Sequence, residues 1–216
     1  MPVDLEMEKQ RAAEEAAALV ESGMRVGLGT GSTVAYLLPA LAKRKLVLNC
    51  VATSPATEQA ARLLGITVEP FTVDRLDIAI DGADQISPEG WLVKGGGAAH
   101  TREKLVAVSA DRFVVIADST KPVATLHAPL PLELLAFGLA STLERLGQVR
   151  LRHVPPSPDG GVIADFTGDI GDPADLAARL EATPGVVDHG LFPPQMVTTV
   201  LIGRGRSVDR VAVAGS

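Results

Sequence analysis

The chain has 216 residues, of which 46% are hydrophobic and 21% charged, a composition typical of a globular protein with a sizeable buried core. Its formal net charge of −6 at pH 7 disfavours nucleic acid and anionic membranes as partners. A small anionic ligand needs only a local positive site and stays possible. Acidic residues run through the N-terminal stretch, which therefore lacks the pattern of a signal peptide. Pro129, Pro131 and Glu133 interrupt the most apolar long window, so we expect no membrane helix.

Cys50 is the single cysteine, so no disulfide can form within the chain. Its place in a predicted strand favours core packing, and a reducing compartment such as the cytoplasm is expected. The four histidines are far apart in the sequence, and no pair has the spacing of metal ligands. We therefore expect no metal site.

The first 121 residues alternate predicted helices and strands. A helix is predicted over 4–21, and further helices over 34–45, 53–64 and 98–110. The predicted strands are 24–28, 46–51, 66–69, 76–80 and 113–117. This alternation predicts an α/β fold with a Rossmann-like, mostly parallel sheet and helices on both faces.

A glycine loop of sequence GTGST, residues 29–33, stands between a predicted strand and a predicted helix, as in an anion-binding cradle. A nucleoside triphosphate loop would need Gly-Lys-Ser/Thr, and a dinucleotide loop would need glycine in place of Ser32. The hydroxyls of Thr30, Ser32 and Thr33 suit a single phosphate group. Alternatively, Ser32 or Thr33 only caps the following helix.

Three polar clusters follow apolar runs between residues 76 and 121. They are DGAD (Asp81–Asp84), KGGG (Lys94–Gly97) and DSTK, which ends at Lys121. The carboxyl ends of parallel strands share one edge of a sheet, and ligands bind there. Each feature alone has an ordinary explanation: a turn, a flexible loop or, for Glu103 in the next helix, a solvated side chain. Together they predict a site.

The sequence changes in character after Lys121. Prolines mark a boundary, and predicted strands and helices then follow in the order βαββαβ, which indicates a ferredoxin-like α+β unit. We predict that residues 129–193 form this second domain. Residues 1–128 and 194–216 are predicted to form the Rossmann-like catalytic domain, because the apolar runs 198–202 and 208–213 return to it.

Seven stretches match one known family, in order, over nearly the whole chain. They are VGLGTGSTV, ATSPATEQAARLLGI, DGAD, VKGGGAAHTREK, ADSTK, PLPLELLAFG and PGVVDHGLF. On these motifs the chain resembles ribose-5-phosphate isomerase of the A type. The resemblance implies interconversion of D-ribose 5-phosphate and D-ribulose 5-phosphate in the non-oxidative pentose phosphate pathway. It also implies no metal or organic cofactor, and a homo-oligomer, commonly a homodimer.

The resemblance also implies roles for individual residues. Glu103 resembles the family's proton acceptor, and we assign Asp81, Asp84 and Lys94 to proton shuttling and charge stabilisation at the enediolate. The implied substrate contacts are Thr30, Gly31, Ser32, Thr33, Asp81, Gly82, Ala83, Asp84, Lys94, Gly95, Gly96, Gly97 and Lys121. Lys9 aligns, less closely, with an N-terminal lysine on the phosphate side.

Two residues depart from the family pattern. Gln85 stands where the family usually has glutamate, and this change spares both aspartates of DGAD. His100 replaces a usually apolar residue and lies one helical turn before Glu103, within electrostatic reach of it.

Other functions on a similar scaffold are disfavoured. A regulatory domain that senses sugar phosphates would usually carry a DNA-binding domain, and residues 1–23 are too short and acidic for one. An amino-sugar-phosphate deaminase or a CoA transferase would not be expected to combine DGAD, KGGG and TREK.

Overall fold

The computed structural model describes residues 3–213 and divides the chain into two compact units. The first unit contains the chain up to Ala83, the segment Arg102–Lys121 and the part from Pro194 onward. The second unit contains Asp84–Thr101 and Pro122–Pro193. The domain division at residues 129 and 193 stays a prediction.

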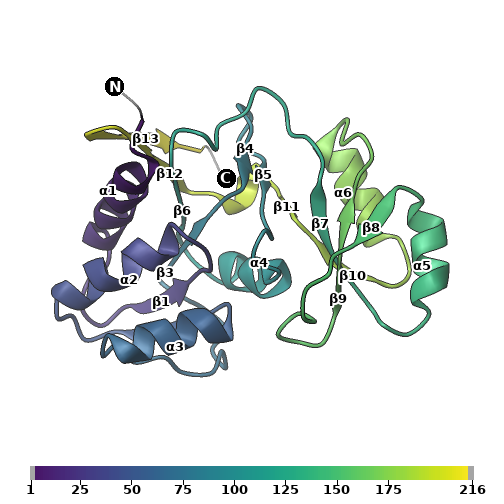
Figure 1. Cartoon of the computed structure of the whole chain (residues 1–216). Coiled ribbons are helices and arrows are strands. Elements are labelled where there is room, and N and C mark those ends of the chain that lie inside the picture. The colour runs from purple at the N-terminus through teal and green to yellow at the C-terminus, as the bar shows by residue number, and fades with distance from the viewer. Residues whose placement is uncertain (1–2, 214–216) are drawn as a thin grey trace. The chain divides into compact units, whose positions relative to one another are not determined.

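In the described part of the first unit, the strands form a six-stranded sheet in the order β13-β12-β6-β3-β1-β2 (Figure 1). All neighbours are parallel except β12 and β13, which confirms the mostly parallel sheet. The strands are β1 (Arg25–Leu28), β2 (Asn49–Ala52), β3 (Ile78–Gly82), β6 (Phe113–Ala117), β12 (Thr199–Arg204) and β13 (Ser207–Ala212). The strand predicted over 66–69 is only a bridge between Cys50 and Val68, and Pro70, which cannot donate to a ladder, follows at once.

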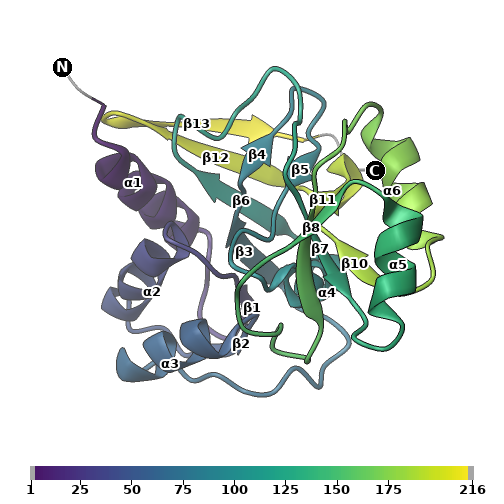
Figure 2. The same cartoon turned by 45° about the vertical axis from the view of Figure 1, so that its right-hand side comes forward.

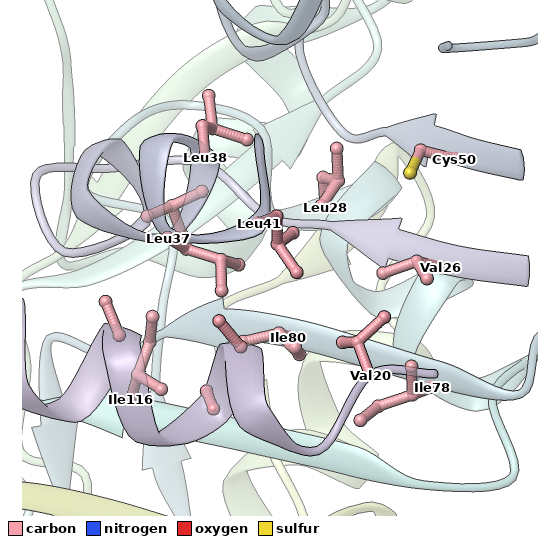
Figure 3. Packing of buried hydrophobic residues seen from close by; sticks show 14 of the residues in the cluster. Val20, Val26, Leu28, Leu37, Leu38, Leu41, Cys50, Ile78, Ile80 and Ile116 are labelled. Carbon is pink, nitrogen blue, oxygen red and sulfur yellow. The ribbon is translucent and has the colours of Figure 1, made fainter. Parts of the chain in front are cut away.

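Helices cover both faces of this sheet. They are α1 (Leu5–Ala18), α2 (Val34–Lys43), α3 (Pro55–Leu63) and α4 (His100–Val108), whose first two residues belong to the second unit. Figure 3 shows the core on one face, where leucines of α2 meet Val26, Leu28 and Ile80. Gly27 alternates with Val26 and Leu28, and a Cβ on it would lie 2.4 Å from Cγ1 of Val106 in α4. α4 therefore packs closely on the opposite face.

Cys50 lies in the same core and is fully buried. Burial raises the pKa of its thiol to about 12, so the thiol stays protonated at neutral pH. The structure thus places Cys50 in the packing role that the sequence predicts.

In the second unit, the described strands form an antiparallel sheet in the order β10-β7-β9-β8 (Figure 2). The elements are β7 (Leu130–Leu134), α5 (Leu139–Leu146), β8 (Val149–Leu151), β9 (Val162–Phe166), α6 (Pro173–Glu181) and β10 (Val186–His189). Their order along the chain confirms the ferredoxin-like βαββαβ prediction. The prediction that KGGG lies at the shared edge of the parallel sheet was wrong. The run before it, β5 (Leu92–Val93), instead pairs antiparallel with β4 (Gln85–Ile86) and β11 (Leu191–Phe192) in a small separate sheet of the second unit.

Side-chain alternation gives the four-stranded sheet two different faces. Leu130, Leu132 and Leu134 join the apolar cluster that contains residues of α5 and α6. Glu133 and Asp165 fall on the intervening positions of β7 and β9, and both are buried. The face away from the helices therefore carries two buried carboxylates.

Among the described residues, no helix is both long and apolar enough to cross a bilayer.

Glu8 connects α1 to the segments that follow strands β6 and β12 in the first unit. Its buried carboxylate accepts hydrogen bonds from the backbone N–H groups of Ser119, at 2.9 Å, and Gly205, at 2.7 Å. Burial by itself raises the pKa of Glu8. The hydrogen bonds from Ser119 and Gly205 and the charge of Arg204 outweigh burial, so the pKa lies below its ordinary value.

A group whose pKa is lowered by folding stabilises the fold above its unfolded pKa, and this contribution disappears as pH falls through the folded pKa. We predict that Glu8→Gln lowers the free energy of unfolding at pH 7 by roughly 1.5–3 kcal/mol, the value of a hydrogen bond to a charged group. The difference from wild type should shrink as pH falls below the ordinary glutamate pKa of about 4.3, because the unfolded chain then binds a proton that folded Glu8 still resists, and it should vanish below the folded pKa. Urea unfolding at several pH values measures this.

Glu6→Gln is the matched control, because Glu6 lies in the same helix and its pKa is also lowered, mainly by its hydrogen bond to Lys9, but its side chain is exposed. It should change stability little at any pH. Equal effects of the two variants would contradict the assignment to Glu8.

Candidate active site

The loops after β1 and β3 meet where the strand order of the first unit reverses. β2 lies on one side of β1 and β3 on the other, so the two loops flank a topological switch point. Open α/β sheets bind ligands at such points, outside the carboxyl ends of the strands. The loop 29–33 and the start of DGAD are thus together, as the shared-edge argument predicts.

Asp81 is fixed directly against the glycine loop. Its Oδ1 accepts hydrogen bonds from the N–H groups of Thr30, at 3.0 Å, and Gly82, at 2.7 Å. A Cβ on Gly29 would lie 1.9 Å from the same oxygen. Glycine at position 29 is therefore required for the loop to approach a buried carboxylate.

A cluster of hydroxyl groups holds the glycine loop 29–33 in place. Thr30 Oγ1 lies 2.8 Å from both Thr53 Oγ1 and Ser54 Oγ, and Thr57 Oγ1 donates to the Gly29 carbonyl at 2.9 Å. Thr30 thus commits its amide to Asp81 and its hydroxyl to this cluster. This cluster was not predicted from the sequence, although the hydroxyl-rich run TSPAT after β2 was a possible signal.

The rest of the loop starts α2. Gly31 has a φ of +130°, a conformation that favours glycine. Thr33 occupies the N-cap position but makes no side-chain capping hydrogen bond, so the structure does not support helix capping as the role of Thr33. Ser32 is exposed beside it. The start of α2 has the polarity that favours an anion.

In the second unit, the KGGG loop is held at every residue from Lys94 to Gly96. Lys94 is buried, its N–H donates to the Gly190 carbonyl at 2.9 Å, and its Nζ lies 5.4 Å from the centroid of the Phe192 ring. Gly95 has a φ of +103°, and a Cβ there would lie 2.8 Å from Nδ1 of His100.

Gly96 completes the loop by holding an aspartate of DGAD. Its N–H donates to Oδ2 of Asp84 at 2.8 Å, and a Cβ on Gly96 would crowd the same carboxylate. The interpretation of KGGG as an unconstrained flexible loop therefore fails. His100, a departure from the family pattern, is part of the packing that fixes Gly95.

Three further residues were predicted to contribute to the site, and each has its own surroundings in the structure. Glu103 lies in the first turn of α4 and is 3% exposed. Lys121 is partly buried after β6, where its N–H donates to the Asp118 carbonyl at 3.3 Å. Lys9 pairs with Glu6 at 2.7 Å. Within residues 3–213, no three His, Cys, Asp or Glu side chains form a group that could hold a metal ion.

Comparison with known proteins identifies the family. Residues 49–207 match the family model of ribose 5-phosphate isomerase A (phosphoriboisomerase A). The chain belongs to this family. A ribose-5-phosphate isomerase A of Caulobacter sp. (strain K31) is 48% identical, over 94% of this chain and 97% of that protein.

Two solved structures of similar proteins agree with this assignment. Ribose 5-phosphate isomerase A from Neisseria gonorrhoeae has a TM-score of 0.94 and 29% identity, over 99% of this chain and all of that chain. A D-ribose-5-phosphate isomerase in complex with phospho-erythronic acid has a TM-score of 0.90 and 32% identity, over 97% and 99% of the two chains. The chain is thus an aldose–ketose isomerase that interconverts ribose 5-phosphate and ribulose 5-phosphate, as its motifs indicate.

The contact between Gly29 and Asp81 gives a prediction for the isomerase. Gly29→Ala places a methyl group where Oδ1 of Asp81 lies, so the carboxylate must move. Because a shift of about 1 Å at a reacting group can cost on the order of 10²-fold, kcat should fall by about that factor. A coupled assay with ribose 5-phosphate measures this, and circular dichroism checks the fold. A folded variant with unchanged kcat would show that the position of Asp81 is not critical.

Proposed function

We propose that Glu103 is the general base of the isomerase reaction. The open-chain sugar loses a proton from C2, forms a cis-enediolate and regains a proton at C1. One carboxylate can serve both carbons because they are neighbours. The proposal is supported by the burial of Glu103 in a packed helix, which restricts its side chain, and by its place in the KGGGAAHTREK motif.

We assign the oxygen chemistry to Asp81, Asp84 and Lys94. The two aspartates would move the proton between O1 and O2, and Lys94 would stabilise the enediolate charge. Support comes from how firmly each is held: Asp81 by the amides of Thr30 and Gly82, and Asp84 by Gly96. Lys94 is almost fully buried, and charges act more strongly away from water.

We propose that the phosphate group binds at the start of α2, through Gly31, Ser32 and Thr33, with Lys121 as a further contact. The Thr30 amide serves Asp81, which leaves the next residues of the loop for the anion. Binding the phosphate far from the reacting carbons can hold a short sugar in register. The backbone of residues 82–83 and 95–97 would complete the substrate contacts.

We further propose a cytoplasmic homodimer that needs no metal or organic cofactor. Phe137 and Leu135 follow β7 in the second unit, with 93% and 51% of their surfaces exposed. Neighbouring exposed apolar side chains are typical of surfaces that associate. Sedimentation equilibrium measures the mass of the assembly, and activity after chelator treatment tests the independence from metal.

The phosphate loop gives a prediction that separates binding from folding. Ser32→Ala with Thr33→Ala should raise KM for ribose 5-phosphate at least tenfold, because a lost hydrogen bond to a charged group costs about 1.5–3 kcal/mol. Activity on unphosphorylated ribose should change much less. Ser22→Ala, whose hydroxyl accepts from Val47 N–H elsewhere in the unit, is the control. Equal losses on both substrates would mean that the loop only supports the fold.

Glu103→Gln tests the base itself. Glutamine keeps the size of the side chain but cannot accept the C2 proton, so kcat should fall by about 10²–10⁴-fold while KM changes little. In heavy water, the wild type should incorporate deuterium at C1 of the product, and the variant should not.

Glu144→Gln in α5 is the control for loss of a helical glutamate and should leave both readouts unchanged. If Glu103→Gln keeps most of kcat, Glu103 is not the base, and Asp81 becomes the next candidate.

A further inference from the structure

Arg152 directly contacts the KGGG loop. It follows β8 in the second unit, and its side chain is only 17% exposed. Its Nη1 donates to the carbonyl of Gly95 at 2.9 Å and lies 3.4 Å from that of Gly96. This arginine belongs to none of the motifs that identify the family.

Asp165 fixes the guanidinium group in this position. Nε and Nη2 of Arg152 both donate to Oδ1 of Asp165, at 2.9 and 2.6 Å. Asp165 is buried on the sheet face away from α5 and α6. Because a planar guanidinium presents its donors in a rigid fork, pairing on one edge aims Nη1 at the loop.

The loop contact involves a single peptide group. The carbonyl of Gly95 and the N–H of Gly96 belong to the same planar unit. Arg152 donates to the oxygen of this unit, and Asp84 accepts from its nitrogen at 2.8 Å. The Gly95 carbonyl also accepts from the N–H of Ala98, a residue with a φ of +59°. Rotation of the peptide would therefore break the contacts with both Arg152 and Asp84.

We propose that Arg152 is a positioning residue for the isomerase reaction. Through the peptide between Gly95 and Gly96 it orients the carboxylate of Asp84, with Asp165 as its anchor. This inference rests on the proposed role of Asp84 in moving the oxygen-bound proton. The competing explanation is that the Arg152–Asp165 pair only stabilises the second unit.

Three variants separate these explanations. Arg152→Gln removes the loop contact but leaves a buried carboxylate without its cation, so it should also lose stability. Asp165→Asn keeps the loop contact and should lose less activity. The double variant removes the loop contact without the unpaired charge, so it should regain stability while its activity stays low.

We expect kcat to fall about 10–100-fold in Arg152→Gln and in the double variant, by analogy with the outer-shell residues that orient metal ligands. KM should change far less. Arg152→Lys should rescue little, since lysine lacks the fork. Arg150→Gln is the matched control: Arg150 lies 3.9 Å from Oδ2 of the same aspartate but is exposed, and its loss should leave kcat near wild type. If kcat returns in the double variant together with stability, the pair is only structural and the inference is wrong.

Asp84→Asn distinguishes failure of the proposed role of Arg152 from failure of the proposed role of Asp84. If Asp84→Asn destroys activity while the double variant keeps it, the inference fails and the proposed site stands. If Asp84→Asn keeps full kcat, the proposed role of Asp84 is wrong and the inference falls with it. If Arg152 acts through Asp84, adding Arg152→Gln to Asp84→Asn should cost little more. If the losses of activity are additive, Arg152 does not act through Asp84 and the inference is wrong.

Discussion

The approach of Gly29 to Asp81 is the constraint on which the arrangement of loop 29–33 and Asp81 in the first unit depends. A buried carboxylate is costly unless it is hydrogen-bonded, and here the amides of Thr30 and Gly82 both donate to Oδ1 of Asp81. They can do so only because residue 29 has no side chain. The hydroxyls of Thr53, Ser54 and Thr57 then hold the loop in that place. The end of β1, the end of β3 and the start of α3 are thus bound together at the switch point of the sheet.

In the second unit, buried hydrogen-bonded carboxylates again fix a loop, here from the antiparallel sheet. Strand alternation sends the leucines of β7 to the helices and leaves Glu133 and Asp165 buried on the other face. Glu133 accepts hydrogen bonds from Thr101, two residues before Glu103, and from Ser157. Asp165 holds Arg152, which holds Gly95. A buried charged network contributes little net stability compared with an apolar core. We infer that this network serves mainly to fix geometry. Here it fixes both ends of the segment from Lys94 to Thr101.

The Rossmann-like sheet and the ferredoxin-like unit could both be predicted, because hydrophobic periodicity and the order of elements are read directly from the sequence. Strand β6 has its predicted bounds, and the elements after Lys121 have their predicted order. The residues of the two loops were also foreseen, since polar clusters follow apolar runs. The side chains that hold these loops were not predicted, because Arg152 and Gly95 are far apart in the sequence, and the pairing of β8 with β9 that places the end of β8 beside Asp165 exists only in the folded sheet. Acids inside the apolar strands LPLEL and VIADF were the available signal, because an ionised side chain at a strand's core position needs a partner.

Electrostatics explains why the residues of loop 29–33 make different contacts. The catalytic groups proposed here include three carboxylates, and a phosphate dianion near them would be repelled. The substrate resolves this conflict, since its phosphate is on C5 while the chemistry takes place at C1 and C2. In the structure the loop is divided accordingly: Thr30 gives its amide to Asp81, and the residues from Gly31 onward start α2 with N–H groups and hydroxyls instead of acids. In the proposed phosphate site, the loop residues Gly31 to Thr33 add no formal charge of their own, and Lys121 is the proposed cationic contact. Under this proposal, the loop would bind the phosphate through backbone dipoles and hydroxyls, without a charge of its own that would alter the protonation state of the base.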